Sequence, residues 1–402
     1  MSIDYADPHM PPHSLTHATI LQIVPSLREE TARAAVNVAY VLIEAGARAI
    51  IASEPGLLLR EFQAYGGEWV PLVSETFNPW RLHQNRRVIE HMIASERVDI
   101  VHAYAPGAAW SARVATAQMA AWLVTSIPDA PSLKRGPRSI YLGGLAKGDR
   151  VIAPSIYAAG AMIQRYRIEP DRMTVIPRSI DTALFNPATM TRERITAVRD
   201  AWRVAPGERI VLVPGRVAPW NGQHLIPDVA RRLTQGGLRG ATFVIAGEDR
   251  SQAAYARAIR QRAADLGVET LIRMTGHCPD MPAAMAAADV VAVPAIEPPI
   301  LGRLVAEAQA MGKPVVTSAV GTLPENVVVP PRISADLRTG WVVKPNDVGE
   351  LAHALSFPLA LDYTSYQALS ARARQFAEYM FSPQSVARAT RSVYTSLLSR
   401  DR

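Results

Sequence analysis

The sequence of 402 residues has a single cysteine, Cys278, which cannot form an internal disulfide and is typical of a reducing compartment. No stretch reaches about 18 consecutive apolar residues, so no membrane-spanning helix is expected. Residues 1–17 lack the apolar core of a secretory signal and have no helical or strand period, which predicts a loose N-terminal tail. These absences together predict a cytoplasmic protein.

Several short motifs of known active sites are also missing. The sequence has no GxSxG, GxxxxGK[ST], HExxH or GxGxxG pattern. Serine hydrolases, P-loop ATPases, zinc proteases and dinucleotide-dependent oxidoreductases are therefore disfavoured. His277 and Cys278 have no further His or Cys at ligand spacing, so we expect no metal site and no metal cofactor.

Lysine is scarce, although the chain is basic. Only four of its 43 basic residues are lysines, and the net charge is +7. This charge favours anionic partners such as nucleotide phosphates or acidic lipid headgroups. The excess of arginine follows as readily from the base composition of a genome as from phosphate binding. Nucleic acid is disfavoured as a partner because the basic residues are dispersed and no recognition motif is present.

Short apolar runs alternate with helical patterns along most of the chain. This alternation predicts an α/β fold with two doubly wound parallel sheets, whose ligands bind in a cleft at the carboxyl ends of the strands. The rhythm breaks at residues 180–203, which we interpret as the join between an N-terminal domain, 18–195, and a C-terminal domain, 196–384. A final helix within 385–402 is expected to pack back on the first domain.

The segment 294–325 follows a predicted strand at 290–293. It predicts a loop, a helix that begins near Gly302 and Arg303 and runs through Met311, and then a short strand at 314–317. The first N–H groups of such a helix carry partial positive charge and favour an anion, most simply a phosphate. Glu307 lies about one turn into this helix and is placed either to bind a ribose diol or to interact with the helix dipole. Glu297 either contacts a sugar hydroxyl or caps a turn.

Three further residues follow predicted strands. Arg216 lies beside Gly215, where it is placed to bind a diphosphate or is an ordinary surface arginine of a turn. His277 is placed to stack against a nucleobase. His102 ends a strand of the first domain, where it either faces the cleft or, as is more common for a lone histidine at a strand end, is structural.

With these features assembled, the sequence resembles the retaining glycosyltransferases of family four, which have the GT-B fold of two Rossmann-like lobes. The resemblance covers nearly the whole chain. The matching segments, in chain order, are ILQIVPSL, VDIVHAYAPGAAWSA, DRVIAPS, VIPRSID, LVPGRVAPWNGQ, VIAGED, GHCPDMPAAMAAADVVAVP and GRLVAEAQAMGKPVV. The resemblance implies transfer of a hexosyl group from a nucleotide diphosphate sugar to a lipid-linked or cell-envelope glycan, with retention and without a metal.

The resemblance also implies roles for single residues. Arg216 matches the first member of the family's Arg and Lys phosphate pair, and the Lys position is Asn221. Glu307 matches the second of two family Glu residues, whereas the first falls on Pro299, two residues after Glu297. Gly302, Arg303 and His277 fall on the donor side, and His102 on the acceptor side.

Two other family positions differ in the first domain. The glycine-rich loop is replaced by Arg-Glu-Glu-Thr at 28–31, and the usual His position is Pro128, with Asp129 beside it. Either Glu297, Asp129 and nearby arginines take over catalysis together with Arg216, or the chain is a catalytically silent relative that binds nucleotide or glycan or scaffolds an active transferase. The basic surface is expected to dock the first domain peripherally on an anionic membrane.

Overall fold

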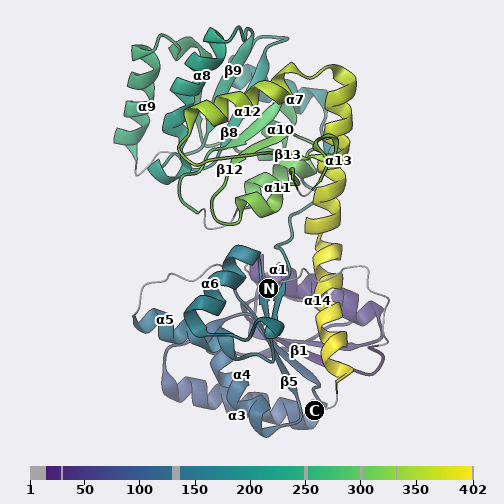
Figure 1. Cartoon of the computed structure of the whole chain (residues 1–402). Coiled ribbons are helices and arrows are strands. Elements are labelled where there is room, and N and C mark those ends of the chain that lie inside the picture. The colour runs from purple at the N-terminus through teal and green to yellow at the C-terminus, as the bar shows by residue number, and fades with distance from the viewer. Residues whose placement is uncertain are drawn as a thin grey trace. The chain divides into compact units, whose positions relative to one another are not determined.

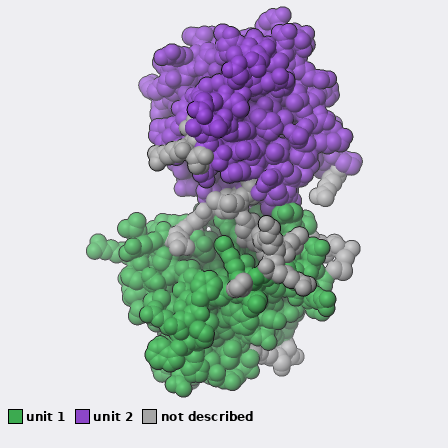
Figure 2. Space-filling model, turned by 90° about the vertical axis from the view of Figure 1, so that its left-hand side faces the viewer, with its two compact units in different colours: residues 1–179, 383–402 green, residues 180–382 purple. Residues whose placement is uncertain are grey.

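The computed structural model describes residues 15–28, 30–128, 136–248, 252–298, 302–331 and 333–400 (Figure 1). The chain forms two compact units, which Figure 2 shows in different colours. Unit 1 comprises Met1–Ser179 and Pro383–Arg402, and unit 2 comprises Ile180–Ser382. Each unit is a parallel sheet with covering helices, so the predicted α/β class with two doubly wound sheets is confirmed.

The sheet of unit 1 has seven parallel strands in the order β3-β2-β1-β4-β5-β6-β7. Its central strands are buried along their length because they are runs of apolar residues with helices against both faces. The strands are β1 (Thr19–Ser26), β2 (Arg48–Glu54), β3 (Glu68–Pro71), β4 (Ile100–Ala103), β5 (Trp122–Ser126), β6 (Arg150–Ala153) and β7 (Met173–Val175).

Seven α-helices of unit 1 lie in the described residues. They are α1 (Glu30–Glu44), α2 (Leu59–Ala64), α3 (Pro79–Glu96), α4 (Pro106–Gln118), α5 (Pro137–Leu142), α6 (Ile156–Tyr166) and α14 (Pro383–Leu398). The C-terminal helix α14 packs against α1 and buries Tyr394 and Leu397 in the core of unit 1. Helix α3 begins where Asn78 Oδ1 accepts from Trp80 N–H, with Pro79 in the first turn.

The sheet of unit 2 has six parallel strands in the order β10-β9-β8-β11-β12-β13. The strands are β8 (Arg209–Pro214), β9 (Ala241–Ala246), β10 (Ile272–Gly276), β11 (Val290–Val293), β12 (Val315–Ser318) and β13 (Gly340–Val343). The helices are α7 (Arg192–Ala201), α8 (Ile226–Gln235), α9 (Ala253–Asp265), α10 (Met281–Ala287), α11 (Arg303–Ala310), α12 (Val348–Ala360) and α13 (Tyr363–Phe381).

The boundary between the units lies at Ser179 and Ile180, about fifteen residues before the join that the sequence pattern suggested at 195. The intervening segment belongs to unit 2 because its apolar side chains pack there. Ile180 and Phe185 are buried in the core of unit 2, and Ile195 of α7 packs against the same cluster. The charged surface of α7 therefore covers an apolar inner face.

The predicted tail, 1–17, falls largely outside the described residues. Leu15 is described and is 2 % exposed, because it packs in the core of unit 1. The core of unit 1 therefore begins at Leu15, within the segment 1–17 that the sequence pattern assigned to the tail. Across the described ranges, no helix is both long enough and apolar enough to cross a bilayer.

Phe243 on β9 is fully buried in the core of unit 2, whereas Phe357 on α12 is 45 % exposed. We expect Phe243→Ala to lower the free energy of unfolding by about 3–5 kcal/mol, because it removes buried apolar contacts and leaves a cavity. Phe357→Ala is the matched control and should cost less than about 1.5 kcal/mol, since its ring stays in contact with water. Chemical denaturation of both variants measures the difference, and equal losses would contradict this description of the core.

Candidate functional site

The residues that the sequence singled out in unit 2 lie at one edge of its sheet. All six strands are parallel, so the loops that follow β8, β9, β10, β11 and β12 emerge at the same carboxyl edge. Ligands of open α/β sheets bind at this edge. Each of these loops contacts a neighbouring loop or helix start, through a glycine, a backbone hydrogen bond or a polar side chain. These contacts define the candidate site.

Arg216 follows β8 and a glycine that no larger residue could replace without strain. Gly215 has φ +114°, and a Cβ added to Gly247, after β9, would lie 1.9 Å from the carbonyl oxygen of Gly215. A Cβ on Gly215 would lie 3.2 Å from Leu304 Cδ1 at the start of α11. The backbone before Arg216 is therefore wedged between β9 and α11, and the side chain of Arg216 is exposed at this edge.

Asn221 shapes the loop after β8. Its Nδ2 donates to the carbonyl oxygen of Arg216 at 2.7 Å, and Gln223 Nε2 donates to the same oxygen at 2.9 Å. Two side-chain amides thus close the loop on itself. Asn221 is uncharged, so it contributes to this loop through its hydrogen bond alone.

The same loop is fixed to the segment that carries Glu297. The carbonyl oxygen of Trp220 accepts from the N–H groups of Ile296 (2.8 Å) and Glu297 (3.2 Å). Gly222 has φ +72°, and an added Cβ would lie 1.9 Å from Pro294 O. These contacts bring Arg216 and Glu297 to neighbouring loops, and the Glu297 side chain is exposed.

Helix α11 begins at the same edge. Its N-cap, Gly302, has φ +51° and provides no side-chain cap for the first N–H groups. Asn326 Nδ2 donates to Gly302 O at 3.1 Å, and a Cβ on Gly302 would lie 2.6 Å from Thr322 Oγ1. The loop after β12 therefore fixes the helix start, whose partial positive charge favours an anion.

Arg303 and Glu307 form an ion pair on α11. Arg303 Nε lies 3.9 Å from Glu307 Oε1, and the two side chains are 36 % and 13 % exposed. The carboxylate of Glu307 is thus the more enclosed of the two groups. It lies one turn from the helix start. A ligand bound at that start can contact the carboxylate only through the small part of the side chain that is exposed.

His277 lies at the rim of this edge, after β10. Its side chain is 68 % exposed, and Nδ1 lies 3.8 Å from Glu248 Oε1. The carbonyl oxygen of Glu248 accepts from Val217 N–H at 3.0 Å, directly after Arg216. Glu248 thus connects the His277 rim to the Arg216 loop.

His102 lies in unit 1 and is fully buried. Its Nδ1 pairs with Tyr394 Oη at 2.5 Å and its Nε2 with Ser126 Oγ at 2.8 Å. Tyr104 stacks on the ring and donates to Gln22 Oε1. Burial lowers the pKa of His102 to about 3, so the imidazole is neutral in the folded protein near neutral pH.

A cavity of about 110 Å³ opens at the carboxyl ends of the unit 1 strands. Its lining is mainly apolar, and the polar residues include His102, Ser126 and Arg178. The guanidinium of Arg178 donates to Pro128 O, so this cation is held at the cavity wall. His102 belongs to this lining but has no area exposed to solvent, and its hydrogen bond with Ser126 suits it to orient that hydroxyl.

The structure brings together Arg216, Asn221, Glu297, Gly302, Arg303, Glu307 and His277 in unit 2. Asp129 lies outside the described residues, as does Pro299. Within the described ranges, no group of three or more His, Cys, Asp or Glu side chains is arranged to hold a metal ion. Glu248, Thr322 and Asn326 were not predicted as site residues from the sequence. Glu248 lies just after β9, whereas Thr322 and Asn326 lie further along the loop after β12 and carry no sequence signal of their own.

Family models match both units. The model described as Glycosyltransferase Family 4 matches residues 31–184, and the model described as Glycosyl transferases group 1 matches residues 208–360. Each match therefore covers most of the sheet of one unit. The Arg216 loop, the Glu297 segment and α11 all lie inside the second match.

Solved structures resemble the whole chain. A glycosyltransferase from Rickettsia africae is 25 % identical, with a TM-score of 0.76, over 96 % of this chain and 100 % of that one. The Anabaena protein HepE in complex with UDP is 19 % identical, with a TM-score of 0.69, over 96 % and 100 %. The second likeness shows the fold alone.

Curated relatives match about half of the chain. The D-inositol 3-phosphate glycosyltransferase of Segniliparus rotundus is 31 % identical over 204 residues, which cover 49 % of this chain and 42 % of that protein. The protein of the same name from Geodermatophilus obscurus is 30 % identical over 250 residues, 60 % and 52 % of the two chains. The chain thus spans about half the length of these relatives or less.

Gly222→Ala tests the contact that joins the Arg216 loop to the Glu297 segment. Gly207→Ala is a matched control, because Gly207 also has a positive φ of +83° but no atom near an added Cβ. Both variants should lose about 1–2 kcal/mol through backbone strain. Only Gly222→Ala should lose more and expose the amides of Ile296 and Glu297 to hydrogen exchange. Equal effects of the two variants would contradict the proposed contact.

Burial of neutral His102 predicts a loss of stability in acid. The unfolded chain protonates this imidazole below about pH 6.5, whereas the folded protein does so only near pH 3. The unfolded state therefore binds more protons in this window, and the free energy of unfolding falls as pH falls, by up to about 5 kcal/mol from this group.

His102→Gln keeps a polar side chain that does not titrate, so its stability should fall less steeply between pH 6.5 and 3. Exposed His83→Gln on α3 is the control and should leave the slope of the native protein unchanged. Denaturant unfolding across this range gives the comparison. An unchanged slope in His102→Gln would show that the buried imidazole is not the cause.

Proposed function

Because the chain belongs to the GT-B glycosyltransferases formed of a family 4 and a group 1 domain, we propose that it transfers a hexosyl group from a nucleotide diphosphate sugar to an acceptor. The anomeric configuration is retained, and no metal takes part. The observation that carries this proposal is the convergence of Arg216, Glu297 and the start of α11 at one edge of unit 2.

Arg216 is the residue proposed to bind the leaving diphosphate. Its guanidinium is exposed at the sheet edge, while hydrogen bonds from Asn221 and Gln223 to its carbonyl hold its backbone in place. Diphosphate leaves with growing negative charge, and a preorganised cation lowers the barrier to its departure. The N–H groups at Gly302 and Arg303 supply further positive potential from the helix start.

Glu307 is proposed to bind the ribose, since a carboxylate accepts hydrogen bonds from both hydroxyls of a diol. Its ion pair with Arg303 directs the carboxylate along α11. Glu297 is proposed to contact the transferred sugar from the neighbouring loop. His277 is proposed to border the base at the rim. Asp129, which belongs to the first unit by sequence, is proposed as a further catalytic residue.

The acceptor is proposed to bind at the cavity of unit 1, whose apolar wall suits the ring faces and lipid part of a lipid-linked or cell-envelope glycan. Arg178 at the wall also suits a phosphate group of the acceptor. The named relatives suggest a second class, an inositol phosphate. Both classes present polyol hydroxyls, and a panel of acceptors separates them.

Peripheral contact with an anionic membrane is proposed for unit 1, with a cytoplasmic location. The outer face of α3 exposes Trp80 (67 %) and Val88 (39 %) beside exposed Arg81 and Arg87. An exposed aromatic ring flanked by cations suits the interface of anionic lipids. Sedimentation with phosphatidylglycerol vesicles tests this contact, and binding that persists after Trp80→Ala would contradict it.

Arg216→Ala should lower the rate of sugar transfer about 10²–10³-fold, because it removes a cationic donor from the leaving diphosphate. Arg260→Ala is the control, since Arg260 is an exposed arginine on α9 of the same unit. Product release from a panel of nucleotide sugars gives the rate. Unaltered turnover in Arg216→Ala would overturn the assignment, and tight nucleotide binding without turnover in the native protein would identify a silent relative.

A further inference from the structure

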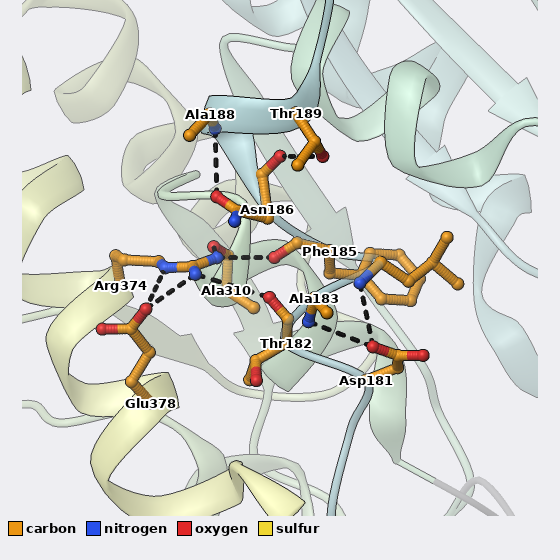
Figure 3. Close-up of polar contacts among 11 residues, drawn as sticks. Asp181, Thr182, Ala183, Phe185, Asn186, Ala188, Thr189, Ala310, Arg374 and Glu378 are labelled. Carbon is orange, nitrogen blue, oxygen red and sulfur yellow. Dashed lines mark hydrogen bonds and ion pairs between the residues drawn. The ribbon is translucent and has the colours of Figure 1, made fainter.

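One guanidinium in unit 2 binds carbonyl groups from two separate segments of the chain. Arg374 lies on α13, and its Nη1 donates to the carbonyl oxygens of Phe185 at 2.6 Å and Ala310 at 2.5 Å. Nη2 reaches Thr182 O at 3.4 Å. Figure 3 shows the Arg374 side chain between these carbonyls, with Glu378 on its other side. A single side chain thus connects α13, the segment 181–189 and α11.

The segment 181–189 lies at the start of unit 2, directly after its first residue, Ile180. Just before it, Ile180 N–H donates to Phe381 O at 2.8 Å, at the end of α13, where the chain returns to unit 1. Asp181 Oδ1 accepts from the N–H groups of Ala183 and Leu184, which fixes a turn. Carbonyl groups in such an irregular segment need partners, and Arg374 satisfies two of them.

The other carbonyl belongs to the last residue of α11. The final carbonyls of a helix have no partner within the helix, and a cation there offsets the negative end of the helix dipole. Close packing holds the same end, because a Cβ on Gly312, just after α11, would lie 2.6 Å from Ser370 Oγ of α13. Arg374 and this contact together fix the far end of α11.

The near end of α11 is the start at Gly302 and Arg303, in the candidate site. A helix of eight residues is about 12 Å long and moves as a stiff rod, so its two ends are positioned together. A shift at the Ala310 end therefore displaces the N–H groups at the other end. The loop after β12 holds this near end through Asn326, and Arg374 holds the far end.

We propose that Arg374 is a positioning residue that fixes α11 for donor binding and ties it to the segment through which the chain enters unit 2. This proposal rests on the proposed function, because it assigns a role to α11 in binding a nucleoside diphosphate. Only arginine suits the position, since its planar fork donates to several carbonyls at once, whereas lysine offers a point charge on a flexible stem. The side chain is 18 % exposed, so these bonds are largely shielded from water.

The test compares Arg374→Ala and Arg374→Lys with Arg372→Ala. Arg372 is a matched control, because it lies on the same helix and donates to one carbonyl, that of Arg338, at 3.4 Å. Hydrogen exchange in the intact protein should show faster exchange at residues 181–185 and 307–311 together in Arg374→Ala. Arg372→Ala should leave both segments unchanged. Faster exchange at one segment alone, or at neither, would overturn the coupling.

Binding of UDP and GDP by calorimetry, well below the unfolding temperature of each variant, is the second readout. Arg374→Ala should bind the nucleotide that the native protein prefers about tenfold more weakly, which corresponds to about 1.4 kcal/mol. Arg374→Lys should recover part of this loss. A purely structural role would lower the unfolding temperature and leave the affinity of the folded protein unchanged, and that result would overturn the proposal.

Failure of the proposed function gives a different pattern. If the native protein binds neither UDP nor GDP, the proposal that a donor binds at α11 is wrong. The proposed role of Arg374 in donor binding is then wrong as well. The exchange measurement still decides whether Arg374 couples the two segments, because it needs no ligand. Native binding together with unchanged affinity in Arg374→Ala overturns only the role of Arg374.

Discussion

The candidate site depends on close contacts between backbone segments at glycines, where there is no room for a side chain. At the carboxyl edge of the unit 2 sheet, Gly222 packs against Pro294 and Gly247 packs against Gly215. A Cβ added to either glycine would lie 1.9 Å from the carbonyl oxygen of the residue it packs against. These contacts hold loops from β8, β9 and β11 in fixed register. The loops after β8, β9 and β11 therefore form one packed base. The exposed side chains at this edge, such as Arg216, are attached to this base and not to loops that move independently.

This packed base explains how a site with few cations can bind an anion through one arginine and the start of a helix. Asn221 uses its amide to close the loop through the carbonyl of Arg216, so the loop keeps its shape without a second positive charge there. The start of α11 supplies the remaining positive potential, and its position depends on contacts at both helix ends. A diphosphate bound here would be held by one side chain and by the backbone.

Much of this arrangement could be predicted from the sequence, because apolar runs mark the strands and the residues after them face one edge. Helices α10, α12 and α13 were not predicted from the sequence: α10 is short, and Pro358 interrupts the pattern of α12. The burial of His102 could not be predicted either, since its partner Tyr394 is 292 residues away. The contacts of Arg374 likewise join residues far apart in sequence, and the close approach of Gly222 to Pro294 appears only in the fold.

The most direct test of the central claim is transfer itself, followed by proton NMR with a panel of nucleotide sugars and phosphate-bearing polyol acceptors. We expect release of nucleoside diphosphate that depends on an acceptor, and a product whose anomeric configuration matches that of the donor. A product of inverted configuration would contradict the retaining mechanism. Absence of both transfer and nucleotide binding would contradict the assignment of the unit 2 edge as a donor site.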